Sequence, residues 1–209
     1  MRHRAVIRTK VVKFLIKRDV IAIGASTGGT EAILKVVRNF PADMPGVVIT
    51  QHMPPKFTDM YAQRLNGILA MEVREAKHGD ILHPGLMLIA PGGMQMRLVR
   101  IGSTYSVSVT EEEKVNGHAP SVDVLFHSVA TAAGEHAIGV ILTGMGADGA
   151  RGIRHMRDSG AYTIGQDEKS CVVYGMPKEA YLLGGVTDQA DLDTIPILIV
   201  RALGRTGLI

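Results

Sequence analysis

The chain has 209 residues, a length that fits one large domain with a buried core and no need for disulfide or metal staples. Its single cysteine, Cys171, excludes an internal disulfide and is typical of a reducing cytoplasm. The formal net charge of +3 predicts a mildly basic surface that would favour anionic partners, but aromatic residues make up only 4 % of the chain, which argues against a nucleic-acid-binding platform.

Residues 1–18 are basic and show no clear period, so we expect a linker or a segment lying on the surface. We expect residues 19–209 to form a single domain. The amino end has no small-residue cleavage site, and no apolar run is long enough to span a bilayer. The sequence therefore predicts neither a signal peptide nor insertion into a membrane.

Short, mostly apolar runs predict strands at residues 20–24, 47–50, 86–90, 138–142 and 161–165, and a shorter strand is predicted around residues 71–75. Helical patterns are predicted at residues 30–37, 57–69 and 121–133, after Gly149, after Pro177 and at 195–203. Residues 94–110 alternate in polarity around Gly102 and Ser103, which indicates an antiparallel hairpin added to the sheet. Buried strands that alternate with helices predict an α/β fold: a doubly wound, mostly parallel sheet with helices on both faces.

The turn after the first strand carries a candidate nucleophile. Residues 24–28 read Gly-Ala-Ser-Thr-Gly, a G-x-S-x-G match that would expose Ser26 at the carboxyl end of a buried strand. Short glycine and serine patterns also bind phosphates or simply turn the chain, so a nucleotide-binding domain stays open. The glycine spacing does not fit the dinucleotide pattern, and no lysine follows as in a P-loop.

Two more chemical groups follow strands of the same sheet. His52 comes after the strand at 47–50, and Asp148 follows the strand at 138–142. Carboxyl ends of parallel strands share one edge, where sites in such sheets lie. A neutral imidazole can take the proton of a serine hydroxyl, and a carboxylate can orient that imidazole. We therefore predict Ser26 as nucleophile, His52 as base and Asp148 as the orienting acid.

Each role has a plainer explanation. Asp148 could cap the helix that follows it, and Asp123 is kept as a reserve third member, although helix capping is its ordinary explanation. In the glycine-rich turn at 143–149, the Met145 backbone N–H could face an oxyanion, although a turn that needs positive φ explains the glycines equally well. The other histidines, His118 among them, fall in predicted turns, helices or the tail without metal-ligand spacing, so we expect no metal and no cofactor.

Six blocks in order, covering about residues 20–187, resemble the catalytic domain of the CheB family of chemotaxis protein-glutamate methylesterases. They are Ile-Gly-Ala-Ser-Thr-Gly-Gly, Gln-His-Met-Pro-Pro, Ile-Ala-Pro-Gly, Pro-Ser-Val-Asp-Val-Leu-Phe, Leu-Thr-Gly-Met-Gly-Ala-Asp-Gly-Ala and Cys-Val-Val-Tyr-Gly-Met-Pro. The resemblance implies that Ser26, His52 and Asp148 form the triad. It also points to the Met145 N–H as an oxyanion donor and to Thr27 as a site neighbour.

The resemblance further implies the substrate, which is γ-glutamyl methyl esters on the cytoplasmic helices of chemoreceptors, hydrolysed to glutamate and methanol. Some relatives also deamidate receptor glutamines, and the mildly basic surface would suit acidic receptor helices. Family members usually carry an amino-terminal receiver domain, which we expect in the full-length protein. The family's histidine after Ile-Ala-Pro-Gly is replaced here by Gln95. A serine esterase for another substrate and a non-catalytic receptor-binding module remain alternatives.

Overall fold

A computed structural model describes residues 18–205. The basic segment expected at residues 1–18 lies outside the described residues, apart from Arg18. No helix within residues 18–205 is both long and apolar enough to cross a membrane.

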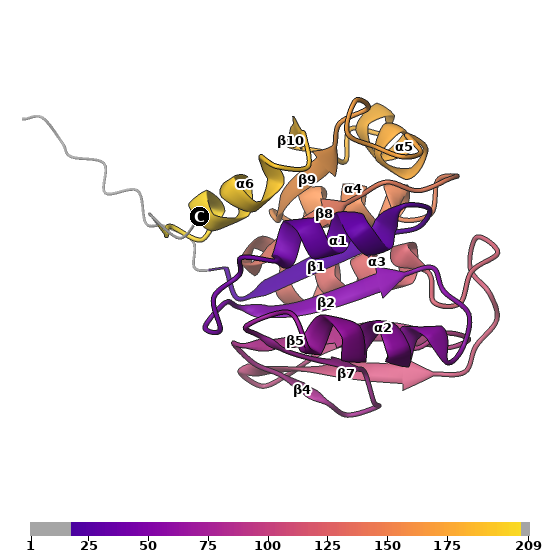
Figure 1. The fold of residues 1–209 in the computed structure, drawn as a ribbon, viewed down its shortest axis with the longest axis vertical. Coiled ribbons are helices and arrows are strands. Elements are labelled where there is room, and N and C mark those ends of the chain that lie inside the picture. The colour runs from indigo at the N-terminus through magenta and orange to yellow at the C-terminus, as the bar shows by residue number, and fades with distance from the viewer. Residues whose placement is uncertain (1–17, 206–209) are drawn as a thin grey trace, which may run out of the picture.

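Seven parallel strands form the central sheet (Figure 1). They are β1 (Val20–Ala25), β2 (Gly46–Gln51), β3 (Glu72–Glu75), β5 (Leu86–Ile89), β8 (Ala137–Ile141), β9 (Tyr162–Gln166) and β10 (Asp188–Ala190). Their spatial order is β10-β9-β8-β1-β2-β5-β3. The chain winds outward from β1 through β2, then returns to β8 on the other side of β1. The strand order therefore reverses between β1 and β8, and ligand sites form outside the carboxyl ends of strands at such a reversal.

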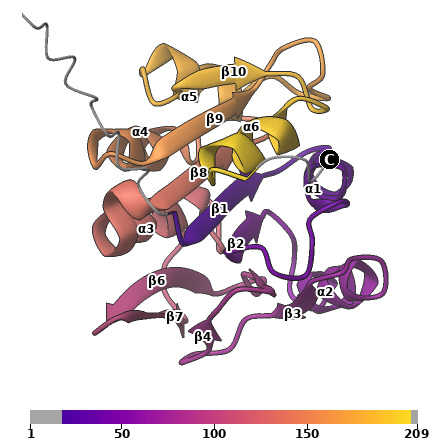
Figure 2. The same cartoon turned by 90° about the vertical axis from the view of Figure 1, so that its left-hand side faces the viewer.

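Helices cover both faces of this sheet (Figure 2). One face carries α1 (Gly29–Val37), α2 (Phe57–Asn66) and α6 (Ile195–Ala202), and the other carries α3 (Val122–Ala133), α4 (Ala150–Asp158) and α5 (Met176–Leu182). A short 3₁₀ helix (Gly134–His136) links α3 to β8. Within β1, Ile21 and Ile23 belong to the core beneath α1, α2 and α6, whereas Val20 and Ala22 belong to the core beneath α3, α4 and α5. Because both faces are buried, the strand is apolar at successive positions, which is the pattern that predicted it.

The expected antiparallel hairpin is present as β6 (Gln95–Ile101) and β7 (Thr104–Thr110). It pairs with the two-residue strand β4 (Ile81–Leu82) to form a separate three-stranded sheet. Leu98 and Val107 of the hairpin share a core with Leu125 and Val129 of α3. The hairpin thus covers α3 and brings the start of β6 close to the start of that helix.

The charge of the folded part differs from the charge of the whole chain. Six of the 23 basic residues, and none of the 20 acidic ones, lie in residues 1–17. The described residues therefore hold 17 basic and 20 acidic side chains, a balance of −3 with neutral histidines. The mildly basic surface expected from the total charge is wrong for the folded part, because the positive excess belongs to residues 1–17.

Candidate active site

The Ser26 turn joins β1, which ends at Ala25, to α1, which begins at Gly29. Its two glycines meet different needs. Gly28 has φ of 78°, a left-handed conformation that side chains other than glycine adopt at a cost. Gly24 has no positive φ, but a Cβ there would lie 2.2 Å from Val122 Cγ1. Gly24 therefore lets α3 pack directly under the strand that carries Ser26.

His52 follows β2 and is held next to the Ser26 turn. The register pairs Ala25 with Gln51, the last residues of β1 and β2, so Ser26 and His52 are the residues that directly follow two neighbouring strands, whose usual spacing is about 4.8 Å. The buried Gln51 amide donates hydrogen bonds to the carbonyl oxygens of both Ser26 (2.9 Å) and His52 (3.2 Å). The His52 N–H donates to the Ala25 carbonyl at 3.2 Å. These bonds fix the two backbones relative to each other.

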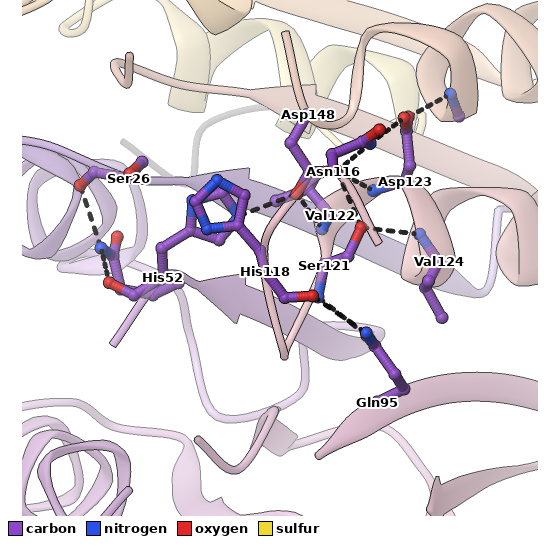
Figure 3. A network of polar contacts seen from close by, with 12 residues as sticks. Ser26, His52, Gln95, Asn116, His118, Ser121, Val122, Asp123, Val124 and Asp148 are labelled. Carbon is purple, nitrogen blue, oxygen red and sulfur yellow. Dashed lines mark hydrogen bonds and ion pairs between the residues drawn. The ribbon is translucent and has the colours of Figure 1, made fainter. Parts of the chain in front are cut away.

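The His52 ring is bonded to Asp148. Its Nε2 lies 2.8 Å from Asp148 Oδ2, and the two side chains are 8 % and 2 % exposed (Figure 3). The other ring nitrogen, Nδ1, is buried and has no hydrogen-bond partner within residues 18–205. No hydrogen bond between described residues joins Ser26 Oγ to His52. The structure therefore brings base and acid into direct contact, and places the serine beside them without a bond.

Asp148 lies in the loop before α4, and its carboxylate reaches the N-terminus of α3, where backbone N–H groups favour negative charge. The donors to its carboxylate are Asn116 Nδ2, Ser121 Oγ, Val122 N and Asp123 N, at 2.7, 2.7, 2.7 and 3.3 Å. Burial opposes ionisation of Asp148, but hydrogen bonds from the His52 ring, Asn116, Ser121 and Val122 outweigh it and lower its pKa to about 2. The carboxyl is therefore ionised at neutral pH and can stabilise an imidazolium.

The loop of residues 143–149 comes close to Ser26. The Ser26 N–H donates to the Thr143 carbonyl at 3.0 Å, and a Cβ on Gly144 would lie 2.8 Å from Ser26 Cβ. Met145 is 74 % exposed, and its backbone N–H donates to no other described residue. Thr27 is exposed, and its carbonyl accepts a hydrogen bond from the Thr143 hydroxyl at 3.0 Å. Both predicted neighbours thus lie on segments next to Ser26.

Asp123, the reserve candidate for the acid, takes a different role. Its carboxylate accepts hydrogen bonds from the Gly152 N–H (2.7 Å) and from Asn116 Nδ2 (2.8 Å), and no bond links it to His52. It ties α3 to α4 and holds Asn116, which in turn bonds to Asp148.

Several site residues were not found by sequence reasoning. Asn116 and Ser121 bond to Asp148. His118, which the sequence predicts only as a histidine without metal-ligand spacing, stacks on the His52 ring. Gln95, whose role the sequence left in doubt, is fully buried, donates to the His118 carbonyl (3.0 Å) and accepts from the Ser121 N–H (2.9 Å). Only Ser121 carried a usable signal, namely its place before a helix as an N-cap.

Cys171 is an unsuitable nucleophile, because burial raises the pKa of its thiol to about 12. Across residues 18–205 no three or more His, Cys, Asp or Glu side chains are grouped so that they could hold a metal ion. The bonded pair of His52 and Asp148 beside the Ser26 turn can support acyl transfer by a serine with a histidine base.

The comparisons with known proteins agree with this chemistry. A family model described as CheB methylesterase matches residues 21–199. A protein of Dechloromonas aromatica, named protein-glutamate methylesterase/protein-glutamine glutaminase 2, is 56 % identical over 95 % of this chain and 53 % of its own length. One of Syntrophomonas wolfei with the same name is 61 % identical over 89 % of this chain and 54 % of its own length.

The fold also matches a solved structure. The catalytic domain of the Thermotoga maritima CheB methylesterase superposes with a TM-score of 0.85 at 32 % identity, covering 89 % of this chain and 99 % of that one. The chain spans about half the length of the curated relatives that it matches.

Proposed function

The chain belongs to the CheB methylesterase family, and from that premise we propose that it hydrolyses γ-glutamyl methyl esters of chemoreceptors to glutamate and methanol. The observation that carries the proposal is the state of the His52 ring. Its Nε2 is bonded to an ionised, buried carboxylate, while its buried Nδ1 has no hydrogen-bond partner within residues 18–205. Ser26 and His52 directly follow Ala25 and Gln51, which are paired across β1 and β2. This state of the ring is the one that a general base needs before it takes a proton.

In the first half-reaction, Ser26 Oγ attacks the ester carbonyl carbon while its proton passes to His52 Nδ1. For this step the Ser26 hydroxyl must point toward that nitrogen, and a rotation about the Ser26 Cα–Cβ bond between staggered positions is the movement required. Asp148 stabilises the imidazolium, and the Met145 N–H, which has no partner among the described residues, donates to the tetrahedral oxyanion. When the intermediate collapses, the C–O bond to the methoxy group breaks and His52 returns the proton, so that methanol leaves.

In the second half-reaction, a water molecule attacks the acyl-enzyme and gives its proton to His52. The bond between the acyl carbon and Ser26 Oγ then breaks, the serine recovers the proton, and glutamate is released. The Asp148 carboxylate keeps the same bonds throughout and is never protonated.

The same site could deamidate receptor glutamines, and the names of the relatives, which include protein-glutamine glutaminase, support this second activity. His52 would then protonate the departing nitrogen, and ammonia would leave in place of methanol. The later hydrolysis of the acyl-enzyme is identical for both substrates.

The remaining assignments belong to the same proposal. Residues 19–209 would act as one catalytic domain, with residues 1–18 as a linker to a receiver domain in the full-length protein. The length of the relatives, about twice that of this chain, is in keeping with such a further domain. The partners would be the cytoplasmic helices of methyl-accepting chemoreceptors.

Methanol release from a methylated receptor fragment tests the proposal. We expect the wild type to release methanol and the Ser26→Ala variant to be slower by roughly 10³-fold or more. Thr30→Ala, a change at a hydroxyl residue on α1 outside the proposed triad, serves as control and should retain activity. Equal methanol release by the wild type and Ser26→Ala would remove Ser26 from the mechanism.

A further inference from the structure

The catalytic imidazole has a second ring lying on it. The His118 and His52 rings have centroids 3.6 Å apart and planes inclined by 12°, so one face of the His52 ring is covered (Figure 3). The His52 ring is attached to the chain through Cβ and is hydrogen-bonded at Nε2. These two points still allow the plane of the ring to rotate about the line that joins them. A parallel ring in contact removes much of this freedom because it fixes the plane. Together the two contacts determine where Nδ1 lies.

We infer that His118 is a positioning residue for the proposed hydrolysis, which orients the His52 ring and shields one face of it from water. The inference rests on the proposed function for its reaction, but the stacking of His118 on the His52 ring does not depend on the substrate. His118 contacts His52, and its proposed role is to orient that ring without contacting the reacting atoms.

His118 is itself held from two sides. Within its own turn, the His118 N–H donates to the Val115 carbonyl (2.9 Å) and the His118 carbonyl accepts from the Val115 N–H (3.0 Å). From β6, the buried Gln95 amide donates to the same His118 carbonyl. Asn116, in the same turn, donates to Asp148. One turn therefore contacts both the base and the acid, and Gln95 anchors it to the hairpin.

The surroundings of the two rings favour the uncharged form of His118. Burial lowers the pKa of His118, and the nearby His52 and Lys114 lower it further, whereas Asp148 opposes them. Among the described residues His118 makes no hydrogen bond to a carboxylate, whereas His52 is paired with Asp148. Of the two stacked rings, only His52 is bonded to Asp148, and His118 can remain an uncharged ring that covers it.

Two variants separate this role from mere loop packing. His118→Phe keeps a flat ring that cannot titrate, and His118→Ala removes the ring. His127→Ala is the matched control, since it also deletes a ring from a histidine pair, that of His127 and His155 on α3 and α4. Circular dichroism and the thermal midpoint would establish that all three variants are folded.

The measurements are kcat and KM for methanol release across pH, and an NMR titration of the His52 ring. For His118→Ala we expect kcat to fall about tenfold with KM within about twofold, because the base is less well oriented. The acid limb and the ring titration should both move to higher pH, since water reaching the exposed ring face stabilises the imidazolium. His118→Phe should keep kcat within about threefold of the wild type, and His127→Ala should match it.

An unchanged kcat and titration in His118→Ala, a change in KM alone, or equal impairment of the Phe and Ala variants would overturn the inference. The NMR titration needs no substrate. If the wild type released no methanol, the proposed function would fail while an upward shift in His118→Ala would still support His118 as the cover of His52.

Discussion

At the scale of single residues, Asp148 is the most constrained group of the site. It is buried, and its carboxylate accepts hydrogen bonds from His52 and from four donors at and before the N-terminus of α3. The same bonds that prepare it to orient His52 also lower its pKa from 3.8 to about 2. Orientation of the base and stability of the fold are therefore coupled at one side chain.

We predict that Asp148 gives the fold a specific acid sensitivity. Because its pKa is lower when folded than when unfolded, its stabilising contribution is complete above the unfolded value of 3.8 and is lost as the pH falls through about 2. The shift corresponds to about 2 kcal/mol in the free energy of unfolding. Urea unfolding of the wild type and Asp148→Asn from neutral pH down to about pH 2 should show the difference between them shrinking by that amount.

The exposed carboxylate of Asp158, which pairs with Arg154 on α4, provides the control. Asp158→Asn should leave the acid dependence close to that of the wild type, because exposed ion pairs contribute little to stability. If the gap between the wild type and Asp148→Asn stayed constant across this pH range, the low pKa of Asp148 would be refuted.

At the scale of elements, the site depends on three loops that follow parallel strands and meet at one edge of the sheet. The loop at 143–149 approaches the Ser26 turn so closely that Gly144 has no room for a side chain. A Cβ there would lie 2.3 Å from Met176 Sδ and 2.8 Å from Ser26 Cβ. The glycine is needed for space, since it is not among the residues with positive φ.

Gly144→Ala should therefore displace Ser26 and lower methanol release by about tenfold or more, with a loss of about 1–3 kcal/mol in the free energy of unfolding. Gly67→Ala is the matched control. Gly67 is the C-cap residue that follows α2, and it has no positive φ. The nearest contact of a Cβ added there would be at 3.6 Å. Wild-type activity in Gly144→Ala would show that this contact does not position the serine.

The sequence predicted the strand ends well because buried parallel strands are apolar on both faces, and this pattern is local. Ser26, His52 and Asp148 could be grouped because parallel strands end at one edge. β4 and β10 were missed, since two or three residues are too few to show a period. His118 and Gln95 were missed because their roles depend on how the hairpin and the turn at 115–118 pack against the sheet, which no local pattern encodes.

At the scale of the whole molecule, charge is distributed unevenly along the chain. The full chain carries +3, whereas the described residues 18–205 carry −3. In net charge, only residues 1–17 favour long-range attraction to an acidic helix.

We expect that deletion of residues 1–17 removes the salt dependence of methyl-ester hydrolysis on a receptor fragment. For the full chain, raising the salt concentration from about 50 to 500 mM should reduce kcat/KM on a receptor fragment severalfold, because screening weakens steering between opposite charges. The truncated chain should show no reduction. A small glutamyl methyl ester serves as control and should be hydrolysed at a salt-independent rate by both. Equal salt sensitivity of the two chains would contradict this account.

Labelling with a fluorophosphonate tests most directly whether His52 and Asp148 activate Ser26, because no receptor is required. Ser26 lies in the tryptic peptide of residues 19–35, so mass spectrometry can locate the label. We predict a single phosphonyl group on Ser26 of the wild type, none in this peptide of Ser26→Ala, and labelling slowed by roughly 10³-fold in His52→Ala and Asp148→Asn. Labelling of Ser26 at the wild-type rate in His52→Ala, or no labelling of the wild type, would contradict the account.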